Sequence, residues 1–130
     1  MTRILHVLDH SLPLHSGYTF RTRAILKAQE AHGLKVRGIT GQRHNLEAAV
    51  TSPQEEADGL IFYRTPGTPS GPAPLREMGE IEALTAAIHA LAHEWRPDII
   101  HAHSPALCGA AAERAARALG IPFVYEIRAF

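Results

Sequence analysis

The stretch Arg3-Ile-Leu-His-Val-Leu8 near the start of the sequence decides the fold class. It is a continuous apolar run, interrupted only by His6, and Asp9 ends it. An alternating pattern would indicate a strand with one solvated face, whereas a continuous run is typical of a strand buried on both faces of a parallel sheet. We therefore expect a parallel sheet with other elements packed on both of its faces.

Strands and helices alternate along the rest of the chain. Beyond residues 3–8, the predicted strands are residues 34–40, 60–63, 98–103 and 121–127. The predicted helices are residues 19–32, 76–95 and 106–119. Residues 42–59 are polar and irregular, and we expect a long loop there because Pro53 and Asp58-Gly59 break any regular pattern.

Apolar residues recur at helical spacing in two of the predicted helices. The stripe in the long second helix consists of Ile81, Leu84, Ile88, Leu91 and Trp95. In the first helix Phe20, Ala24 and Ala28 recur at a spacing of four. Such repeats predict one apolar face on each helix.

Strands that alternate with helices predict an α/β fold with helices on both faces of a parallel sheet. Right-handed crossovers make a Rossmann-like sheet of about five strands in the order 3-2-1-4-5 the expected topology. No predicted helix follows the last strand to cover that end of the sheet. We therefore expect residues 1–130 to be one domain that is incomplete.

The composition excludes several classes of protein. The 130 residues include 13 basic and 13 acidic residues, so the net charge of zero argues against a dedicated nucleic-acid-binding protein, which needs a basic excess. A content of 45% apolar and 20% charged residues excludes global disorder. The single cysteine, Cys108, excludes an internal disulfide and favours a reducing compartment such as the cytoplasm. No apolar run approaches the ~20 residues that span a bilayer.

A ligand site is expected where the first and fourth strands meet. In open parallel sheets, ligands bind beyond the carboxyl ends of the strands, at the point where the strand order reverses. In the predicted order this point is bordered by residues 9–18 and residues 101–106. These two segments hold four of the nine histidines of the chain, which supports the same location.

The first of these segments leads into a helix and supplies the candidate substrate-binding residues His15, Ser16, Gly17 and Tyr18. Free N–H groups at a helix start can hold a phosphate, and Gly17 would let the ligand approach closely. The structural alternative is that Ser16 and Gly17 only form a turn and a cap. The G-x-G-x-x-G and P-loop motifs are absent, which argues against NAD and ATP, and we predict no cofactor.

The second segment supplies the candidates His101, His103 and Ser104, as a polar wall that contacts a hydroxyl or phosphate of the substrate. For His101 the alternative is a histidine packed and hydrogen-bonded inside the sheet. A zinc site usually needs four ligands, and Cys108 adds only a third, so we predict no metal. Glu126 and Arg128 alternate at the end of the last strand and are the candidate catalytic residues.

Three stretches of the sequence carry a family resemblance. They are residues 3–23, which include Asp9-His-Ser-Leu-Pro-Leu-His-Ser-Gly17, the segment Asp98-Ile-Ile-His-Ala-His-Ser-Pro105, and Pro122-Phe-Val-Tyr-Glu-Ile-Arg-Ala-Phe130. Together they resemble family 4 glycosyltransferases of the GT-B fold, closest to the subgroup associated with exosortase and exopolysaccharide gene clusters. The resemblance covers essentially the whole chain but only the N-terminal half of such an enzyme.

The resemblance implies retaining transfer of a sugar, as by a hexosyltransferase, from a nucleotide-diphosphate sugar to a glycan or lipid-linked acceptor. In this family the N-terminal domain chiefly receives the acceptor, and its first loop closes over the donor diphosphate, which implies that Ser16 and Gly17 contact it. Family members often carry two glycines there, and a histidine where this chain has Glu126 or Arg128. The residues that hold the donor belong to a C-terminal domain outside residues 1–130. The fragment alone is then expected to be inactive.

Two other functions fit the residues. One is a stand-alone binding module for a small phosphorylated ligand, and the other is a metal-dependent hydrolase that uses His101 and His103. The expected location is the cytoplasm. Peripheral contact with the inner face of the membrane is compatible with a lipid-linked acceptor, although a neutral chain lacks the basic patch that binds anionic lipids.

Overall fold

The computed structural model describes residues 1–127. Its elements in chain order are β1 (Arg3–Leu8), α1 (Gly17–Ala31), β2 (Lys35–Thr40), α2 (His44–Glu47), β3 (Gln54–Ala57), β4 (Leu60–Arg64), α3 (Ala73–Glu94), β5 (Ile99–His103), α4 (Ala106–Leu119) and β6 (Phe123–Glu126). β1 and α4 have the predicted boundaries, and the other predicted elements differ only at their ends. No helix in the described residues is long and apolar enough to cross a bilayer.

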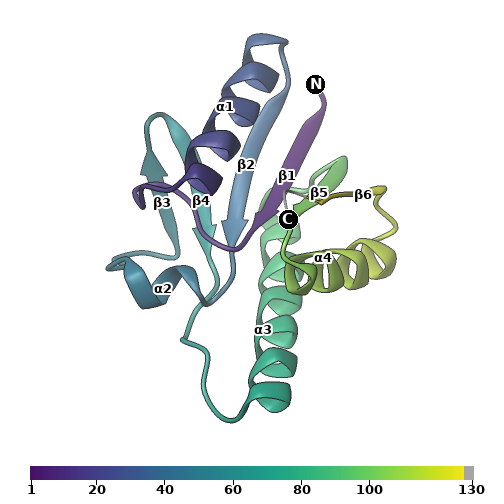
Figure 1. Cartoon of the computed structure of the whole chain (residues 1–130). Coiled ribbons are helices and arrows are strands. Elements are labelled where there is room, and N and C mark those ends of the chain that lie inside the picture. The colour runs from purple at the N-terminus through teal and green to yellow at the C-terminus, as the bar shows by residue number, and fades with distance from the viewer. Residues whose placement is uncertain (128–130) are drawn as a thin grey trace.

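All the strands form one sheet in the order β3-β4-β2-β1-β5-β6 (Figure 1). From β4 to β6 the neighbouring strands are parallel, and these are the predicted strands in the predicted order. β3 is antiparallel to β4 and adds an edge that was not predicted. The prediction of a Rossmann-like α/β fold is therefore confirmed.

The segment 42–59 was predicted to be irregular, but it contains α2 and β3. The sequence of β3 is Gln54-Glu-Glu-Ala57, in which apolar and polar residues do not alternate. This strand lies at the edge of the sheet and is largely solvated, so it needs no apolar face. The turn into β4 has positive φ angles of 53° at Asp58 and 76° at Gly59. Since Asp-Gly is a preferred pair for a tight hairpin turn, this pair was the signal for β3 in the sequence.

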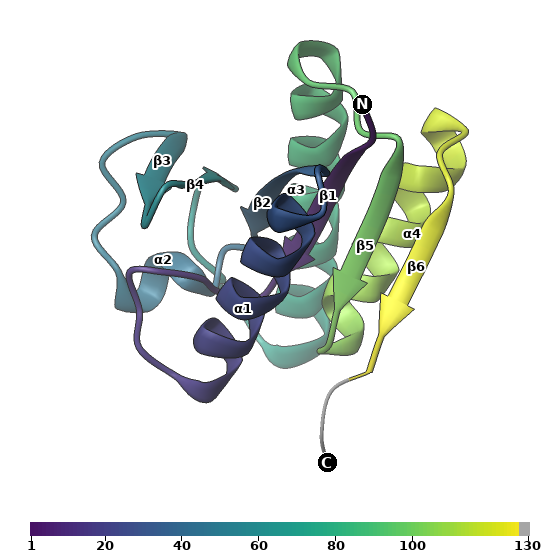
Figure 2. The same cartoon turned by 90° about the horizontal axis from the view of Figure 1, so that it is seen from above.

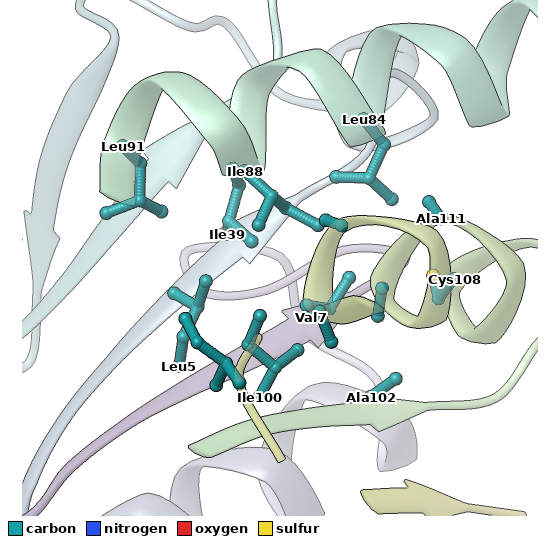
Figure 3. Packing of buried hydrophobic residues seen from close by; sticks show 14 of the residues in the cluster. Leu5, Val7, Ile39, Leu84, Ile88, Leu91, Ile100, Ala102, Cys108 and Ala111 are labelled. Carbon is teal, nitrogen blue, oxygen red and sulfur yellow. The ribbon is translucent and has the colours of Figure 1, made fainter. Parts of the chain in front are cut away.

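α3 and α4 pack on one face of the sheet, and α1 lies on the other (Figure 2). The predicted stripe of α3 is confirmed, since Leu84, Ile88, Leu91 and Trp95 are buried and Ile81 packs against them. Figure 3 shows Leu84, Ile88 and Leu91 facing residues of the sheet, among them Leu5, Ile39 and Ile100. α4 presents small side chains to the same core, namely Ala111, Ala112, Ala115 and Ala116. Their small size lets α4 lie close to both α3 and the sheet.

The apolar repeat of α1 lies on the outer side of that helix, so it does not mark the buried face. Phe20 is 50% exposed, and Ala24 and Ala28 are also exposed. The buried residues are Thr19, Thr22 and Leu26. Two hydroxyl groups can be buried here because each has a partner within the helix: Thr22 Oγ1 donates to the Tyr18 carbonyl, and Thr19 Oγ1 accepts from Ser16.

Candidate functional site

The carboxyl ends of β1 and β5 lie side by side and bring the two predicted loops to one edge of the sheet (Figure 2). The strands are parallel, with Val7 opposite Ala102, so the loops 9–16 and 104–105 leave the sheet at the same level. β2 ends there too, because the backbone N–H of Gly41 donates to the Leu8 carbonyl at 3.0 Å. This edge is the predicted location of the site.

Arg64 is a buried arginine at the end of β4, and it anchors the loop 9–16. Its side chain is 1% exposed. Nη1 donates to Ser11 Oγ at 2.6 Å, and Nη2 donates to the Leu12 carbonyl at 2.8 Å. Burial lowers the pKa of Arg64, and its ion pair with Glu55, at 2.8 Å, opposes that effect. The arginine thus fixes the backbone of the loop as well as one of its side chains.

His44, the first residue of α2, anchors the same loop from a second side. The backbone N–H of Ser11 donates to His44 Nδ1 at 3.3 Å. Burial, reinforced by the charge of Arg64, lowers the pKa of His44 to about 4. The ring is therefore neutral near pH 7, with its proton on Nε2. That nitrogen is buried and has no hydrogen-bond partner in the described part of the chain.

A hydrogen-bonded chain links Asp9, His10 and Ser16 within this loop. Asp9 Oδ2 lies 2.8 Å from His10 Nδ1, and His10 Nε2 lies 3.0 Å from Ser16 Oγ. Ser16 Oγ also accepts from the backbone N–H of Thr19, so the predicted cap of α1 is present. Tyr18 contacts two of these residues. Its ring lies 4.6 Å from the ring of His10, and its hydroxyl accepts a hydrogen bond from the backbone N–H of Asp9. Asp9 and His10 were not among the candidates predicted from the sequence.

Gly17 and His15 lie at the exposed start of α1. A methyl group placed on Gly17 would meet no atom within 4 Å. The fold itself therefore does not need a glycine here, and the space beside Gly17 is open to a ligand. The His15 ring lies 5.5 Å from the ring of Phe20, on the solvent side.

Three histidines gather on the α1 face of the sheet. His6 and His101 are in register on β1 and β5, and His6 Nδ1 lies 2.8 Å from His103 Nε2. The rings of His101 and His103 are stacked at 4.6 Å. His103, expected to contact substrate, is fully buried because His6 and Glu126 enclose its ring. His103 is thus packed inside the fold. His101, for which packing was the alternative, is also largely packed, since it is bonded to Glu126 and its side chain is only 16% exposed.

Glu126 connects this cluster to α1. Its Oε1 lies 3.2 Å from His101 Nε2, and its Oε2 lies 3.9 Å from His103 Nδ1 and 3.8 Å from Arg21 Nη2. The candidate Ser104 is half-buried beside it, and its backbone N–H donates to the Glu126 carbonyl. The other catalytic candidate, Arg128, lies outside the described residues.

Arg43 is a cation at this edge that the sequence analysis missed. Its Nε donates to Glu80 Oε1 at 2.9 Å, and its Nη1 lies 3.9 Å from Asp9 Oδ1. The hydrogen bond to the buried Glu80 raises the pKa of Arg43. Arg43 follows β2, whose carboxyl end also borders the edge, so the loop after β2 was the signal in the sequence.

A separate groove of about 620 Å³ lies between α3 and β4. Its lining includes Ile39, Tyr63, Ala87 and Leu91, and no residue of the loops 9–16 or 104–105. Because these side chains belong to the α3 face of the sheet, the groove is distinct from the loop edge.

The sequence matches the family described as "Glycosyl transferase 4-like domain" over residues 16–130. No curated protein matches it.

Solved structures share the fold at low sequence identity. MurG from Acinetobacter baumannii matches 98% of this chain with a TM-score of 0.64 and 17% identity. Sucrose-phosphate synthase from Thermosynechococcus elongatus matches 96% with a TM-score of 0.70 and 14% identity. The match covers 34% and 32% of those proteins, so this chain spans about a third of their length. The C-terminal domain of a hydrogenase from Pyrococcus furiosus also matches 96% of the chain and is itself 91% covered, with a TM-score of 0.61 and 17% identity.

Proposed function

Because this chain belongs to the glycosyl transferase 4-like family, we propose that residues 1–130 form the N-terminal, acceptor-side domain of a retaining glycosyltransferase. Its donor-binding domain would then lie C-terminal to these residues. The complete enzyme would move a sugar from a nucleotide-diphosphate sugar to a glycan or lipid-linked acceptor in exopolysaccharide biosynthesis. The observation that carries this proposal is the open start of α1, which lies at the carboxyl edge of the sheet.

The start of α1 suits a diphosphate. α1 has 15 residues, and a helix of that length presents partial positive charge at its first turn. Gly17 leaves room for close approach, and the capping residue Ser16 adds a hydroxyl. Arg43 and His10 bring basic groups to the same edge through their contacts with Asp9.

The proposed mechanism is electrostatic. Breaking the bond between a sugar and a diphosphate builds negative charge on the departing diphosphate. N–H groups and cations that point at this charge stabilise the transition state more than the ground state, and removal of one such donor typically lowers kcat by about 10²-fold to 10³-fold. We assign this role to the first turn of α1, together with the basic groups beside it.

The other side of the edge suits an acceptor. His101 and Glu126 are partly exposed and bonded to each other, so they can hydrogen-bond an acceptor hydroxyl while keeping a fixed orientation. Ser104 follows them along β5. Arg128 keeps its proposed catalytic role.

Substitution of Gly17 tests the proposal in the complete enzyme. We expect Gly17→Ala to lower kcat/KM at least tenfold, and Gly17→Val to lower it roughly 10²-fold, because the added carbons occupy the space of the diphosphate. The melting temperature should not fall, since an added methyl meets no protein atom.

Gly79→Ala is the matched control. Gly79 lies in α3, is exposed, and also has no atom within 4 Å of an added methyl. This variant should keep the wild-type kcat/KM. Wild-type kinetics in both Gly17 variants would remove the first loop from the mechanism.

A further inference from the structure

We propose that His6, His101 and His103 form a binding site for a divalent transition-metal ion, with Zn²⁺ as the expected ion. One ring nitrogen from each histidine lies within 4.8 Å of the corresponding nitrogens of the other two. Imidazole is a ligand that Zn²⁺ readily accepts, and three protein ligands with one open position form a known type of zinc site. From the sequence, His101 and His103 were grouped with Cys108, which lies in the core formed by α3, α4 and the sheet, and not with His6 of β1.

The sheet places these ligands on one surface. His6 and His101 are opposite each other on neighbouring parallel strands. His103 follows two residues later on β5, so it points to the same side as His101. All three therefore project from the α1 face of two paired strands, which is a rigid support for a metal site.

Side-chain oxygens hydrogen-bond the opposite nitrogen of two of the rings, and another carboxylate oxygen lies near that of the third. His6 Nε2 lies 2.7 Å from Gln29 Oε1 of α1. His101 Nε2 lies 3.2 Å from one oxygen of Glu126, and His103 Nδ1 lies 3.9 Å from the other. Metal-bound histidines commonly donate their second N–H to a carboxylate or an amide oxygen in this way. The nitrogens that remain for the ion are His6 Nδ1, His103 Nε2 and the Nδ1 of His101.

Binding changes where one proton of this pair lies. At 2.8 Å, His6 Nδ1 and His103 Nε2 share a proton. Because His6 Nε2 donates to Gln29 Oε1, the neutral His6 ring accepts at Nδ1 and His103 donates from Nε2. When Zn²⁺ enters, this proton moves to His103 Nδ1, beside Glu126, and both nitrogens become ligands. With Zn–N bonds of about 2.0–2.1 Å in tetrahedral geometry, the two nitrogens would separate to roughly 3.3 Å. The ring of His101, which is stacked on that of His103, would also rotate so that its Nδ1 points at the ion.

Burial and charge favour an ion at this position. His6 and His103 are fully buried, and the partly exposed His101 marks the side from which the ion enters. The carboxylate of Glu126 contacts two of the three rings and offsets part of the positive charge. Because the ion would link β1 to β5, and β6 through Glu126, it should stabilise the folded protein whatever reaction the domain supports.

Titration of the protein with ZnCl₂ tests the site by calorimetry, and by the melting temperature with and without the ion. We expect one Zn²⁺ per chain and a higher melting temperature when it is bound. His101→Asn should weaken binding at least tenfold. Because His101 is partly exposed, we expect this variant to keep the fold, which circular dichroism checks. Gln29→Ala keeps all three ligands and should weaken binding about tenfold through the lost hydrogen bond to His6.

His93→Ala is the matched control, because His89 and His93 are one turn apart on α3 and form the other histidine pair that could hold an ion. This variant should bind Zn²⁺ as the wild type does. Absence of binding by the wild-type protein, unchanged affinity in both His101→Asn and Gln29→Ala, or loss of binding in His93→Ala would each overturn the proposal.

Discussion

His44 shows how a single buried side chain makes the candidate site sensitive to pH. Its Nδ1 accepts from the backbone of Ser11, and burial holds its folded pKa at about 4, against 6.5 for an exposed histidine. Between these two values the unfolded chain binds a proton at His44 that the folded chain does not. Acidification through this window therefore favours unfolding.

We expect the free energy of unfolding to fall as the pH decreases from 6.5 to 4, by up to about 3 kcal/mol from this residue. Below pH 4 the contribution should level off, because both states are then protonated. Urea unfolding at a series of pH values measures the slope.

His44→Gln should flatten this pH dependence, because the amide does not titrate in the window. The exposed His93 provides the control, and His93→Gln should keep the wild-type slope. An unchanged slope in His44→Gln would show that another group causes the acid sensitivity.

At the scale of elements, the loop 9–16 depends on a strand and a helix that are distant in the sequence. Arg64 at the end of β4 contacts both Ser11 and Leu12, and His44 of α2 contacts Ser11 from another side. If the loop binds a ligand as proposed, such fixation reduces the ordering that the ligand must impose, which favours both affinity and positioning.

Arg64→Met should therefore destabilise the protein by about 3 kcal/mol, because it leaves Glu55 and the loop acceptors without their buried partner. We also expect the backbone amides of residues 9–16 to exchange hydrogen faster in this variant than in the wild type, which mass spectrometry can measure. The control Arg114→Met changes an exposed arginine of α4 and should leave both quantities unchanged. Equal exchange of the loop in Arg64→Met and wild type would contradict the anchoring role.

At the scale of the whole molecule, this domain presents one wall of the proposed site. The start of α1 and the ends of β5 and β6 form a single edge, with Glu126 and Arg21 3.8 Å apart across it. An open edge of this kind buries only part of a ligand, whereas small-molecule sites usually enclose most of the ligand surface.

We therefore expect the 130-residue chain by itself to bind nucleotide-diphosphate sugars weakly and to transfer no sugar. Isothermal titration calorimetry with a panel of nucleotide sugars measures the first, and product analysis measures the second. Binding as tight as that of the complete enzyme would show that the donor site lies in residues 1–130, contrary to the division of labour we propose.

Long and strongly patterned segments were predictable from the sequence, and short polar ones were not. The continuous apolar run of β1 and the helical apolar spacing of α3 are clear enough to be recognised without tertiary context. β3 and α2 are only four residues each, and pairing and packing decide such short elements. α1 was found, but its buried face was wrong, because hydrogen bonds make Thr19 and Thr22 acceptable in the interior.

The order of the elements, the parallel sheet and the edge where the loops after β1 and β5 meet follow from the sequence by itself, because apolar periodicity and the handedness of crossovers are local properties. The environment of each side chain at that edge was decided only by the tertiary structure. His6 meets His103, and Arg64 meets Ser11, from positions 97 and 53 residues apart. Such pairs form because folding excludes water and each buried polar atom then needs a hydrogen-bond partner. The spacing of residues along the chain does not predict which partner that will be.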